Sequence, residues 1–396
     1  MYVAQRFRSP SQLRKRLAIA FAGSALLLCE RSGHSLRMHS VSWADGMIAT
    51  TKGRYHLRGQ VYNTKARRGS YTFDRGTGQV IDDKDGVVGV FSAHPIDMSP
   101  IDILRPGDAK MPIMHICNSE IMTEIQKSEN EGAYFVLPSQ LNGAEYPSND
   151  EIIQSIDDYR FDQTGGPRGQ LAVHPAAGQF ILDNAANERR PLGINAVQEL
   201  LQELDAANLR FRLENGYLVV PKLPESQHEI AIAIMHQHLH TLRVLMMEEI
   251  PACGLTPSKE DWSPAEHRVN LVYASAVPIQ AYMNYGDATH ARLQEAVGSL
   301  VLLAQYLGAL KTAARNAKSA GKGKRIFLMP LGGGVFNNPW AMIFVSMAKA
   351  VELLSEEERA CLDIQVLTWQ GNPSEKQHAT RCLSKLGKLK PPAARL

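Results

Sequence analysis

Short apolar segments alternate with longer helical segments between residues 87 and 369, and this alternation constrains the fold more than any other feature of the sequence. VVGVFSA (87–93) and AYFVLPS (133–139) have the length and the branched or aromatic residues of buried strands. The segment at 118–132 ends at Gly132 and the segment at 288–318 runs into Gly321-Lys322-Gly323, as helices often end. A chain that alternates in this way folds as an α/β domain. We therefore predict a mixed, largely parallel sheet with helices on both of its faces.

The remaining elements follow the same alternation. We predict further strands at 268–278, 324–330 and 362–369, and further helices at 151–159, 170–186, 195–207, 226–249 and 338–354. The segment LRFRLENGYLVVP is predicted to be a hairpin that turns at Asn215-Gly216, a dipeptide that suits a tight turn between antiparallel strands.

Three parts are expected along the chain. Residues 1–86 form an N-terminal extension, which holds a candidate targeting segment and a small β meander with alternating apolar positions between turn signals. Residues 87–372 form the α/β domain, and residues 373–396 form a basic, flexible tail.

The candidate targeting segment is an uncharged run at residues 17–29, LAIAFAGSALLLC, which directly follows Arg14-Lys15-Arg16. It is shorter than the about 20 apolar residues that a membrane-spanning helix needs, so no membrane span is expected. The basic flank and the run match the first two regions of a signal peptide, but Cys29-Glu30-Arg31 makes a poor cleavage site. We favour an N-terminal helix over a cleaved signal peptide.

Composition excludes several classes of function. The 43 Lys and Arg residues nearly balance the 40 Asp and Glu residues, so no dominant basic field exists and no nucleic-acid partner is expected. Five cysteines without a C-x-x-C pair argue against a zinc ribbon or a disulfide scaffold and favour free thiols. His236 and His240 have the spacing of a metal-binding pair, but no glutamate follows His236 and no third ligand is evident. We expect no metal and no cofactor.

The strongest local signal is RIFLMPLGGGVFNNPWAMIF (325–344), in which a buried strand runs into Gly332-Gly333-Gly334 and then into a helix. Successive glycines let the backbone turn its N–H groups toward an anion, because no Cβ blocks the approach. Pro339 suits the first helical turn, and the helix N-terminus adds the positive end of its dipole. The segment predicts a diphosphate-binding loop that is neither a Walker A loop nor a G-x-G-x-x-G loop. The alternative is a tight strand-to-helix turn without a ligand.

Polar loops follow the strand at 133–139, in SQLNGAEYPS and YRFDQTGGPRGQ. Asn142 offers donor and acceptor groups to ribose hydroxyls, and Gly165-Gly166-Pro167 is a rigid turn with free backbone donors. A carboxylate beside this turn can act as a general base or stabilise an oxocarbenium-like centre. The candidate carboxylates are Glu145, Asp157, Asp158 and Asp162. Any one of them is alternatively a helix cap or a solvated charge.

A third loop begins at the end of the strand at 268–278, where Ala274-Ser275-Ala276 offers small side chains that let a ligand approach. The alternative is a strand that ends beneath a helix. Open α/β sheets bind ligands outside the carboxyl ends of their strands, so this loop and the loops after 133–139 and 324–330 are where we expect the chemistry.

Together, the three loops resemble those of the macrodomain family, the ADP-ribose-binding α/β fold. LMPLGGGVFNNPWAMIFVSMAKAV resembles the family's second phosphate loop, NLVYASAVP the strand before it, and SQLNGAEYPS with DQTGGPRGQLA the first loop. The set S-Q-x-N-x-x-E, D-x-T-x-G-P and GGG-[VA]-F-x-N is similar to a divergent branch related to poly(ADP-ribose) glycohydrolase, which includes bacterial effector ADP-ribosylhydrolases. The resemblance extends over residues 110–370.

The resemblance implies ADP-ribose as the ligand. It implies that the diphosphate and the distal ribose are held by Gly332, Gly333, Gly334, Val335, Phe336 and Asn337. It also implies that the ligand is bordered by Asn142, Thr164, Gly165, Gly166, Gln170 and Ser275. The chain departs from the family at two places. The glycohydrolase signature has paired glutamates after its glycine-rich loop, where this chain has Arg168-Gly169-Gln170, and Asn337 replaces the usual glycine after Phe336.

The favoured hypothesis is an ADP-ribosylhydrolase that removes ADP-ribose from a modified protein side chain through attack of water at the distal ribose. Asp162 is the first choice for the catalytic carboxylate, followed by Asp158 and Glu145. A non-catalytic ADP-ribose reader and an unrelated nucleotide-sugar enzyme are the alternatives. The expected partners are ADP-ribose and an ADP-ribosylated protein, with ubiquitin as one candidate. The expected location is the cytoplasm or, for a secreted effector, a host cytosol.

Overall fold

The computed structural model describes residues 71–97, 114–148, 151–254, 263–279, 288–321 and 324–389. The candidate targeting segment lies outside these residues. The strands are β1 (Tyr71–Asp74), β2 (Gln79–Asp82), β3 (Gly86–Pro95), β4 (Met114–Ser119), β5 (Tyr134–Pro138), β6 (Arg212–Glu214), β7 (Tyr217–Val219), β8 (Arg243–Gly254), β9 (Ser263–Ala274), β10 (Lys324–Leu328) and β11 (Leu362–Trp369).

The helices pack around these strands. They are α2 (Ile121–Gln126), α3 (Gly165–Leu171), α4 (Pro175–Asn184), α5 (Gln198–Ala206), α6 (Glu225–His238), α7 (Ala288–Ala320), α8 (Trp340–Glu352), α9 (Glu356–Ala360) and α10 (Pro373–Lys385). Short 3₁₀ helices are η2 (Ser128–Asn130), η3 (Ile156–Phe161) and η4 (Leu239–Thr241).

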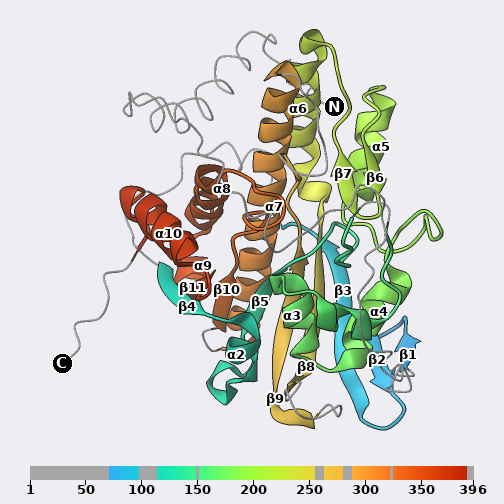
Figure 1. Cartoon of the computed structure of the whole chain (residues 1–396), viewed down its shortest axis with the longest axis vertical. Coiled ribbons are helices and arrows are strands. Elements are labelled where there is room, and N and C mark those ends of the chain that lie inside the picture. Colours follow the sequence, from blue (N-terminus) through green and yellow to red (C-terminus); the bar gives the residue numbers. More distant parts are fainter. Residues whose placement is uncertain are drawn as a thin grey trace, which may run out of the picture. The chain divides into compact units, whose positions relative to one another are not determined.

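A nine-stranded mixed sheet with the order β1-β2-β3-β8-β9-β5-β10-β11-β4 organises the described residues (Figure 1). The strands β9, β5, β10, β11 and β4 are parallel to one another, whereas β1, β2, β3 and β8 each pair antiparallel with their neighbours. β5 therefore lies between β9 and β10, the two strands that follow it in the parallel block. The predicted mixed α/β sheet is confirmed.

Helices cover both faces of this sheet. Tyr134 and Leu137 of β5 point to opposite faces, because successive side chains of a strand alternate. Asn316 of α7 donates a hydrogen bond to the Tyr134 hydroxyl (2.6 Å). Gly169 of α3 lies so close to Leu137 that an added Cβ would be 2.4 Å from its side chain. Since α7 and α3 contact opposite sides of one strand, the prediction of helices on both faces is also confirmed.

The helix α7 is the core helix of the domain. It is long and apolar enough to cross a membrane, but 83% of its most apolar window is buried inside the protein. Its buried side chains include Leu303, Tyr306, Leu307 and Leu310. Packing against the sheet therefore accounts for the apolar composition of this helix.

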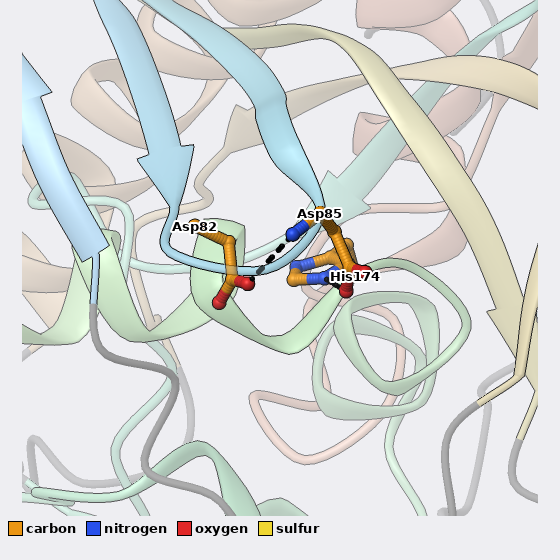
Figure 2. Close-up of side chains that lie close together, drawn as sticks. All are labelled: Asp82, Asp85 and His174. Atoms are coloured by element: carbon orange, nitrogen blue, oxygen red, sulfur yellow. Dashed lines mark hydrogen bonds and ion pairs between the residues drawn. The ribbon is translucent and has the colours of Figure 1, made fainter.

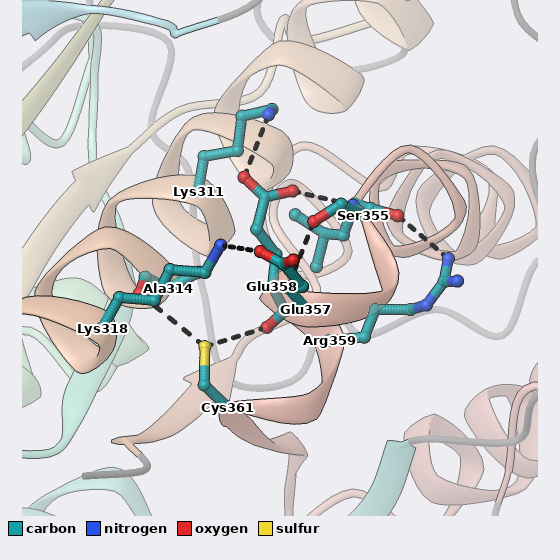
Figure 3. Close-up of polar contacts among 9 residues, drawn as sticks. Lys311, Ala314, Lys318, Ser355, Glu357, Glu358, Arg359 and Cys361 are labelled. Atoms are coloured by element: carbon teal, nitrogen blue, oxygen red, sulfur yellow. Dashed lines mark hydrogen bonds and ion pairs between the residues drawn. The ribbon is translucent and has the colours of Figure 1, made fainter. Parts of the chain in front are cut away.

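Polar contacts tie α9 to α7, as Figure 3 shows. The Ser355 hydroxyl accepts a hydrogen bond from the Glu358 N–H (3.1 Å), and the Glu358 carboxylate accepts one from the Ser355 N–H (2.7 Å). This capping box satisfies two backbone donors at the start of α9. Lys311 and Lys318 of α7 reach Glu358 (3.2 Å) and Glu357 (3.0 Å). These contacts fix the start of β11, which follows α9 directly.

Two predicted helices are wrong over part of their length. The segment predicted as a helix at 118–132 begins with the end of the edge strand β4, and α2 covers only part of the remainder. The helix predicted at 226–249 ends at His238, and the chain continues as β8 from Arg243. Leu, Met and Glu in LMMEE favour a helix by intrinsic propensity. Pairing with β3 on one side and β9 on the other overrides that preference.

The ends of the domain also differ from the expected boundaries. Residues 373–385, expected in a flexible tail, form α10, because Pro373 suits a first helical turn and Ala379 and Leu383 bury one face. The strands β1 and β2, expected in a separate extension, pair with each other and with β3 and so extend the main sheet. The helix expected at 170–186 is divided between α3 and α4, since Pro175 starts a new helix.

Candidate functional site

A cavity of about 230 Å³ lies at the carboxyl ends of the parallel strands. Each strand of the parallel block contributes a residue at or just beyond its end: Ser119, Ser139, Ala276, Met329 and Trp369. The chain passes from β9 on one side of β5 to β10 on the other, so the loops after these strands diverge and leave a crevice. This is the place at which open α/β sheets bind ligands, as the sequence predicted.

Tyr306 of α7 makes hydrogen bonds to the backbone of the loop after β10. The Tyr306 hydroxyl donates to the Met329 carbonyl (2.8 Å) and accepts from the Leu331 N–H (2.9 Å). Because Tyr306 is fully buried, this clamp sets the backbone directly before the glycines. Gly332 has a φ of +77°, and an added Cβ would lie 2.7 Å from Ala276. The residue at position 332 must therefore be glycine.

Asn338 joins this loop to the loop after β9. Its amide nitrogen donates to the Val277 carbonyl (2.9 Å), its amide oxygen accepts from the Ile279 N–H (3.0 Å), and its own N–H donates to the Gly332 carbonyl (3.0 Å). The side chain is buried. Two of the loops that the sequence singled out are thus one connected unit.

The predicted glycine-loop residues divide into two groups. Gly332, Gly334, Val335 and Phe336 line the cavity. Gly333 does not line the cavity, and a Cβ added to it would lie 2.4 Å from the Trp340 ring. Asn337 is also outside the lining; it is exposed, has a φ of +50°, and donates its N–H to the Gly334 carbonyl (2.9 Å).

The opposite loop, after β5, brings Glu145 to the cavity wall. Its N–H donates to the hydroxyl of the buried Tyr159 (2.8 Å), which positions the residue. The Glu145 carboxylate lies 3.3 Å from the point where a Cβ on Gly166 would be, and the same Cβ would be 2.0 Å from the Pro138 carbonyl. The first turn of α3 therefore packs directly against the end of β5 and places Thr164 and Gly165 in the cavity lining.

The three predicted catalytic carboxylates lie in different surroundings. Burial and the negative charge of Asp162 hold the pKa of Glu145 well above its usual range. Asp162 accepts the Thr164 N–H (2.7 Å) with one carboxylate oxygen and does not line the cavity. Asp158 is exposed on η3 and is outside the lining as well. Of the three, Glu145 has direct access to a ligand in the cavity.

Three further predicted residues belong to the scaffold around the cavity. Asn142 is fully buried, donates to the Ala186 carbonyl (2.7 Å) and accepts from the Ala144 N–H (3.1 Å). Ser275 is buried, and its hydroxyl donates to the Ala276 carbonyl (3.1 Å). Gln170 is fully buried in α3. None of the three is part of the cavity lining.

Sequence reasoning missed an ion pair in the cavity wall. Arg168 Nε donates to the Glu120 carboxylate (2.6 Å), and both side chains line the cavity. Glu120 directly follows β4, and its other carboxylate oxygen accepts the Thr123 N–H (3.1 Å) as the N-cap of α2. If 114–119 is recognised as a strand in the sequence, Glu120 directly follows the carboxyl end of that strand and becomes a candidate site residue.

Glu375 was missed because residues 373–396 were expected to be a tail, and Trp369 was missed because the end of the strand at 362–369 was not among the three strand ends at which chemistry was expected. Glu375 of α10 accepts the Trp369 N–H (3.0 Å), and both residues line the cavity. Burial raises the pKa of Glu375 to about 7, and the hydrogen bond from Trp369 opposes this rise. The Trp369 side chain is 50% exposed and offers an aromatic surface at the site.

Asp82, Asp85 and His174 form a group whose potential ligand atoms all lie within 4.8 Å of one another (Figure 2). His174 Nδ1 accepts the Ala176 N–H (3.3 Å), which assigns the ring proton to Nε2 and lets Nε2 donate to Asp85 (3.0 Å). A metal would need the Nε2 lone pair, but a neutral imidazole has only one free lone pair. The group therefore fits a polar link between the β2–β3 turn and α4 better than a metal site.

The comparisons with known proteins give structural matches alone. No family model matches the sequence, and no curated protein matches it. A point mutant of poly(ADP-ribose) glycohydrolase from Deinococcus radiodurans, in complex with ADP-ribose, is 11% identical with a TM-score of 0.41 over 75% of this chain and 95% of that chain. Another structure of that enzyme with ADP-ribose is 14% identical with a TM-score of 0.40 over 75% and 95%.

Poly(ADP-ribose) glycohydrolase from Thermomonospora curvata is 14% identical with a TM-score of 0.34 over 80% of this chain and 93% of that chain. At such low identities and TM-scores, the function proposed below rests on the residues of this chain.

The raised pKa of Glu145 predicts a pH-dependent stability. In the unfolded state Glu145 loses its proton as the pH rises above the usual pKa near 4.5, whereas in the folded state it keeps the proton to higher pH. The contribution of Glu145 to the free energy of unfolding therefore decreases as the pH rises above about 4.5 and up to the raised pKa of the folded state. Glu145→Gln lacks the effect and is expected to be more stable than the wild type at about pH 8, with no such advantage at about pH 4. Urea unfolding at both pH values measures this.

The matched control is Glu151→Gln, which changes an exposed carboxylate of the same loop and is expected to alter neither midpoint. A Glu145→Gln variant that is less stable than the wild type at the higher pH contradicts the assigned burial of this carboxyl.

Proposed function

We propose that this protein binds ADP-ribose in the cavity and hydrolyses the bond between its distal ribose and a modified protein side chain. The observation that carries the proposal is the convergence, in one cavity, of the glycine loop at 332–334 and of the protonatable carboxyl of Glu145. A diphosphate needs donors that can approach closely, and glycosidic hydrolysis needs a carboxyl that can give and take a proton.

The glycine loop supplies the diphosphate site. The N–H groups of Gly332, Gly334 and Val335 donate to no other residue that the structure describes. An added Cβ at Gly334 would have no atom within 4 Å, so the cavity side of this residue is open. Backbone donors in such a turn bind anions without a side-chain clash. The exposed Trp369 ring offers a stacking surface to the base of the same ligand.

Glu145 supplies the proton transfers. With its pKa raised, the carboxyl is protonated in the resting state and can give its proton to the leaving side-chain atom. Water then bonds through its oxygen to the anomeric carbon and returns a proton to the carboxylate, which restores the starting state. Burial, with a further contribution from the negative charge of Asp162, keeps Glu145 protonated, so Asp162 acts through Glu145. We propose an ADP-ribosylated protein as the substrate.

The glycine loop predicts a selective loss of ligand binding. Gly334→Val is expected to weaken ADP-ribose binding by at least about tenfold, since a branched side chain would occupy the space next to the backbone donors. The melting temperature is expected to stay near that of the wild type, because no atom lies within 4 Å of the new Cβ. Titration calorimetry and a melting curve measure the two quantities.

Gly333→Val is the matched comparison. Its Cβ would lie 2.4 Å from the Trp340 ring, so this variant is expected to lose stability itself. Wild-type ADP-ribose affinity in a folded Gly334→Val protein would refute the proposed diphosphate site.

The role of Glu145 predicts a loss of turnover without a loss of binding. General acid–base catalysis contributes about 10²–10⁴-fold, so Glu145→Gln is expected to slow release of ADP-ribose from a modified protein by that factor. The affinity for free ADP-ribose is expected to survive. Asp162→Asn is expected to move the high-pH limit of turnover to lower pH, because removing the negative charge lowers the pKa of Glu145.

Single-turnover assays across pH separate these outcomes, with Glu151→Gln as the control. Binding of ADP-ribose without any release from modified proteins would make the protein a reader of ADP-ribose. An unchanged pH profile for Asp162→Asn would remove Asp162 from the site.

A further inference from the structure

The cavity wall holds more acidic than basic side chains. Three carboxyl groups line the cavity, from Glu120, Glu145 and Glu375. Among the described residues that line it, Arg168 is the sole Lys, Arg or His. A diphosphate brings two further negative charges into this space. Burial raises the pKa of Glu145 and of Glu375 and so reduces their negative charge, but neither carboxyl attracts a phosphate. Arg168 is therefore the side chain of this lining whose charge can attract one.

Arg168 is held in place by two residues of the same wall. Its Nε donates to Glu120 (2.6 Å) and its Nη1 donates to Gln163 (2.8 Å). A guanidinium has five N–H donors, so three remain beyond these two bonds. Both oxygens of the Glu120 carboxylate accept hydrogen bonds, one from Arg168 and the other from the Thr123 N–H. Glu120 therefore orients Arg168 and leaves its remaining donors for a ligand.

The exposure of the pair fits this role. The side chain of Glu120 is 11% exposed and that of Arg168 is 29% exposed, so Arg168 is the more accessible partner of the pair. A fixed guanidinium presents parallel donors that match phosphate oxygens, and such charge-assisted bonds are stronger than neutral ones. Orientation by Glu120 also reduces the conformational entropy that Arg168 loses when a ligand binds.

We propose that Arg168 binds a phosphate of the ligand, with Glu120 as its positioning residue, so that the diphosphate is held by one guanidinium as well as by the glycine loop. This inference rests on the proposed binding of ADP-ribose. It also replaces the expectation from the resemblance at this position: where the related signature has paired glutamates, this chain supplies a cation for phosphate.

The test removes the charge of the pair while keeping its hydrogen bond. Arg168→Gln alone would leave the Glu120 charge unpaired and threatens folding, so the main variant is the double substitution E120Q/R168Q. The matched control is D157N/R160Q, which neutralises the Asp157–Arg160 pair (3.3 Å) outside the cavity lining. Both proteins are titrated with ADP-ribose and with adenosine, which carries no phosphate, at low and high salt.

The proposal predicts that E120Q/R168Q binds ADP-ribose about 10- to 100-fold more weakly than the wild type, since bonds between charged groups are lost. Adenosine affinity is expected to be unchanged, and the salt dependence of ADP-ribose binding is expected to decrease. D157N/R160Q is expected to behave as the wild type with both ligands.

Two results would overturn the inference and leave the proposed function in place. The first is wild-type ADP-ribose affinity in E120Q/R168Q, which would assign the whole diphosphate site to the backbone. The second is an equal loss of ADP-ribose and adenosine binding, which would make the pair a structural element of the wall. A wild-type protein that binds neither ligand would refute the proposed function together with this inference.

Discussion

The position of β5 between two parallel neighbours is the constraint on which the site depends. Because β9 lies on one side and β10 on the other, the loops that leave these strands diverge and cannot close the space above β5. The buried contacts of those loops then keep the space open. Tyr306 clamps the backbone after β10, and Asn338 ties the same loop to the end of β9. The cavity is therefore a consequence of strand order, and side chains from the core maintain it.

The electrostatics of the cavity follow from its burial. Carboxyl groups in its wall are partly removed from water, so the pKa of Glu145 is raised well above its usual range and that of Glu375 is raised to about 7. Protonation of these two groups lowers the negative charge that an anionic ligand meets. Glu120 keeps an ion pair with Arg168 instead. The proposed binding of a diphosphate and the proposed proton transfer by Glu145 thus depend on the same low-dielectric surroundings.

The sequence predicts those parts of the site that depend on backbone conformation. The glycine triplet stood out because successive glycines leave the backbone N–H groups open to an anion. The structure gives Gly332 a φ of +77° beside Ala276 and places Gly332 and Gly334 in the cavity lining. Asn142 shows where such reasoning fails. Its amide has the groups that a ribose would need, but the Ala186 carbonyl and the Ala144 N–H already occupy them. Which partner a polar side chain takes is decided by tertiary contacts that no local pattern records.

The origin of the acidic group in this site follows from the packing of α3. The residues after the Gly165-Gly166 turn enter the core, since Gln170 and Leu171 are buried, and a carboxylate there would lose its solvation without a partner. The one residue that this helix sends to the cavity beyond its glycine turn is Arg168, a cation. The carboxyl must then come from another segment, and the loop after β5 supplies Glu145. The backbone N–H of Glu145 donates to the Tyr159 hydroxyl, which positions the residue. The acid and the cation of this cavity therefore come from different segments of the chain, Glu145 from the loop after β5 and Arg168 from α3.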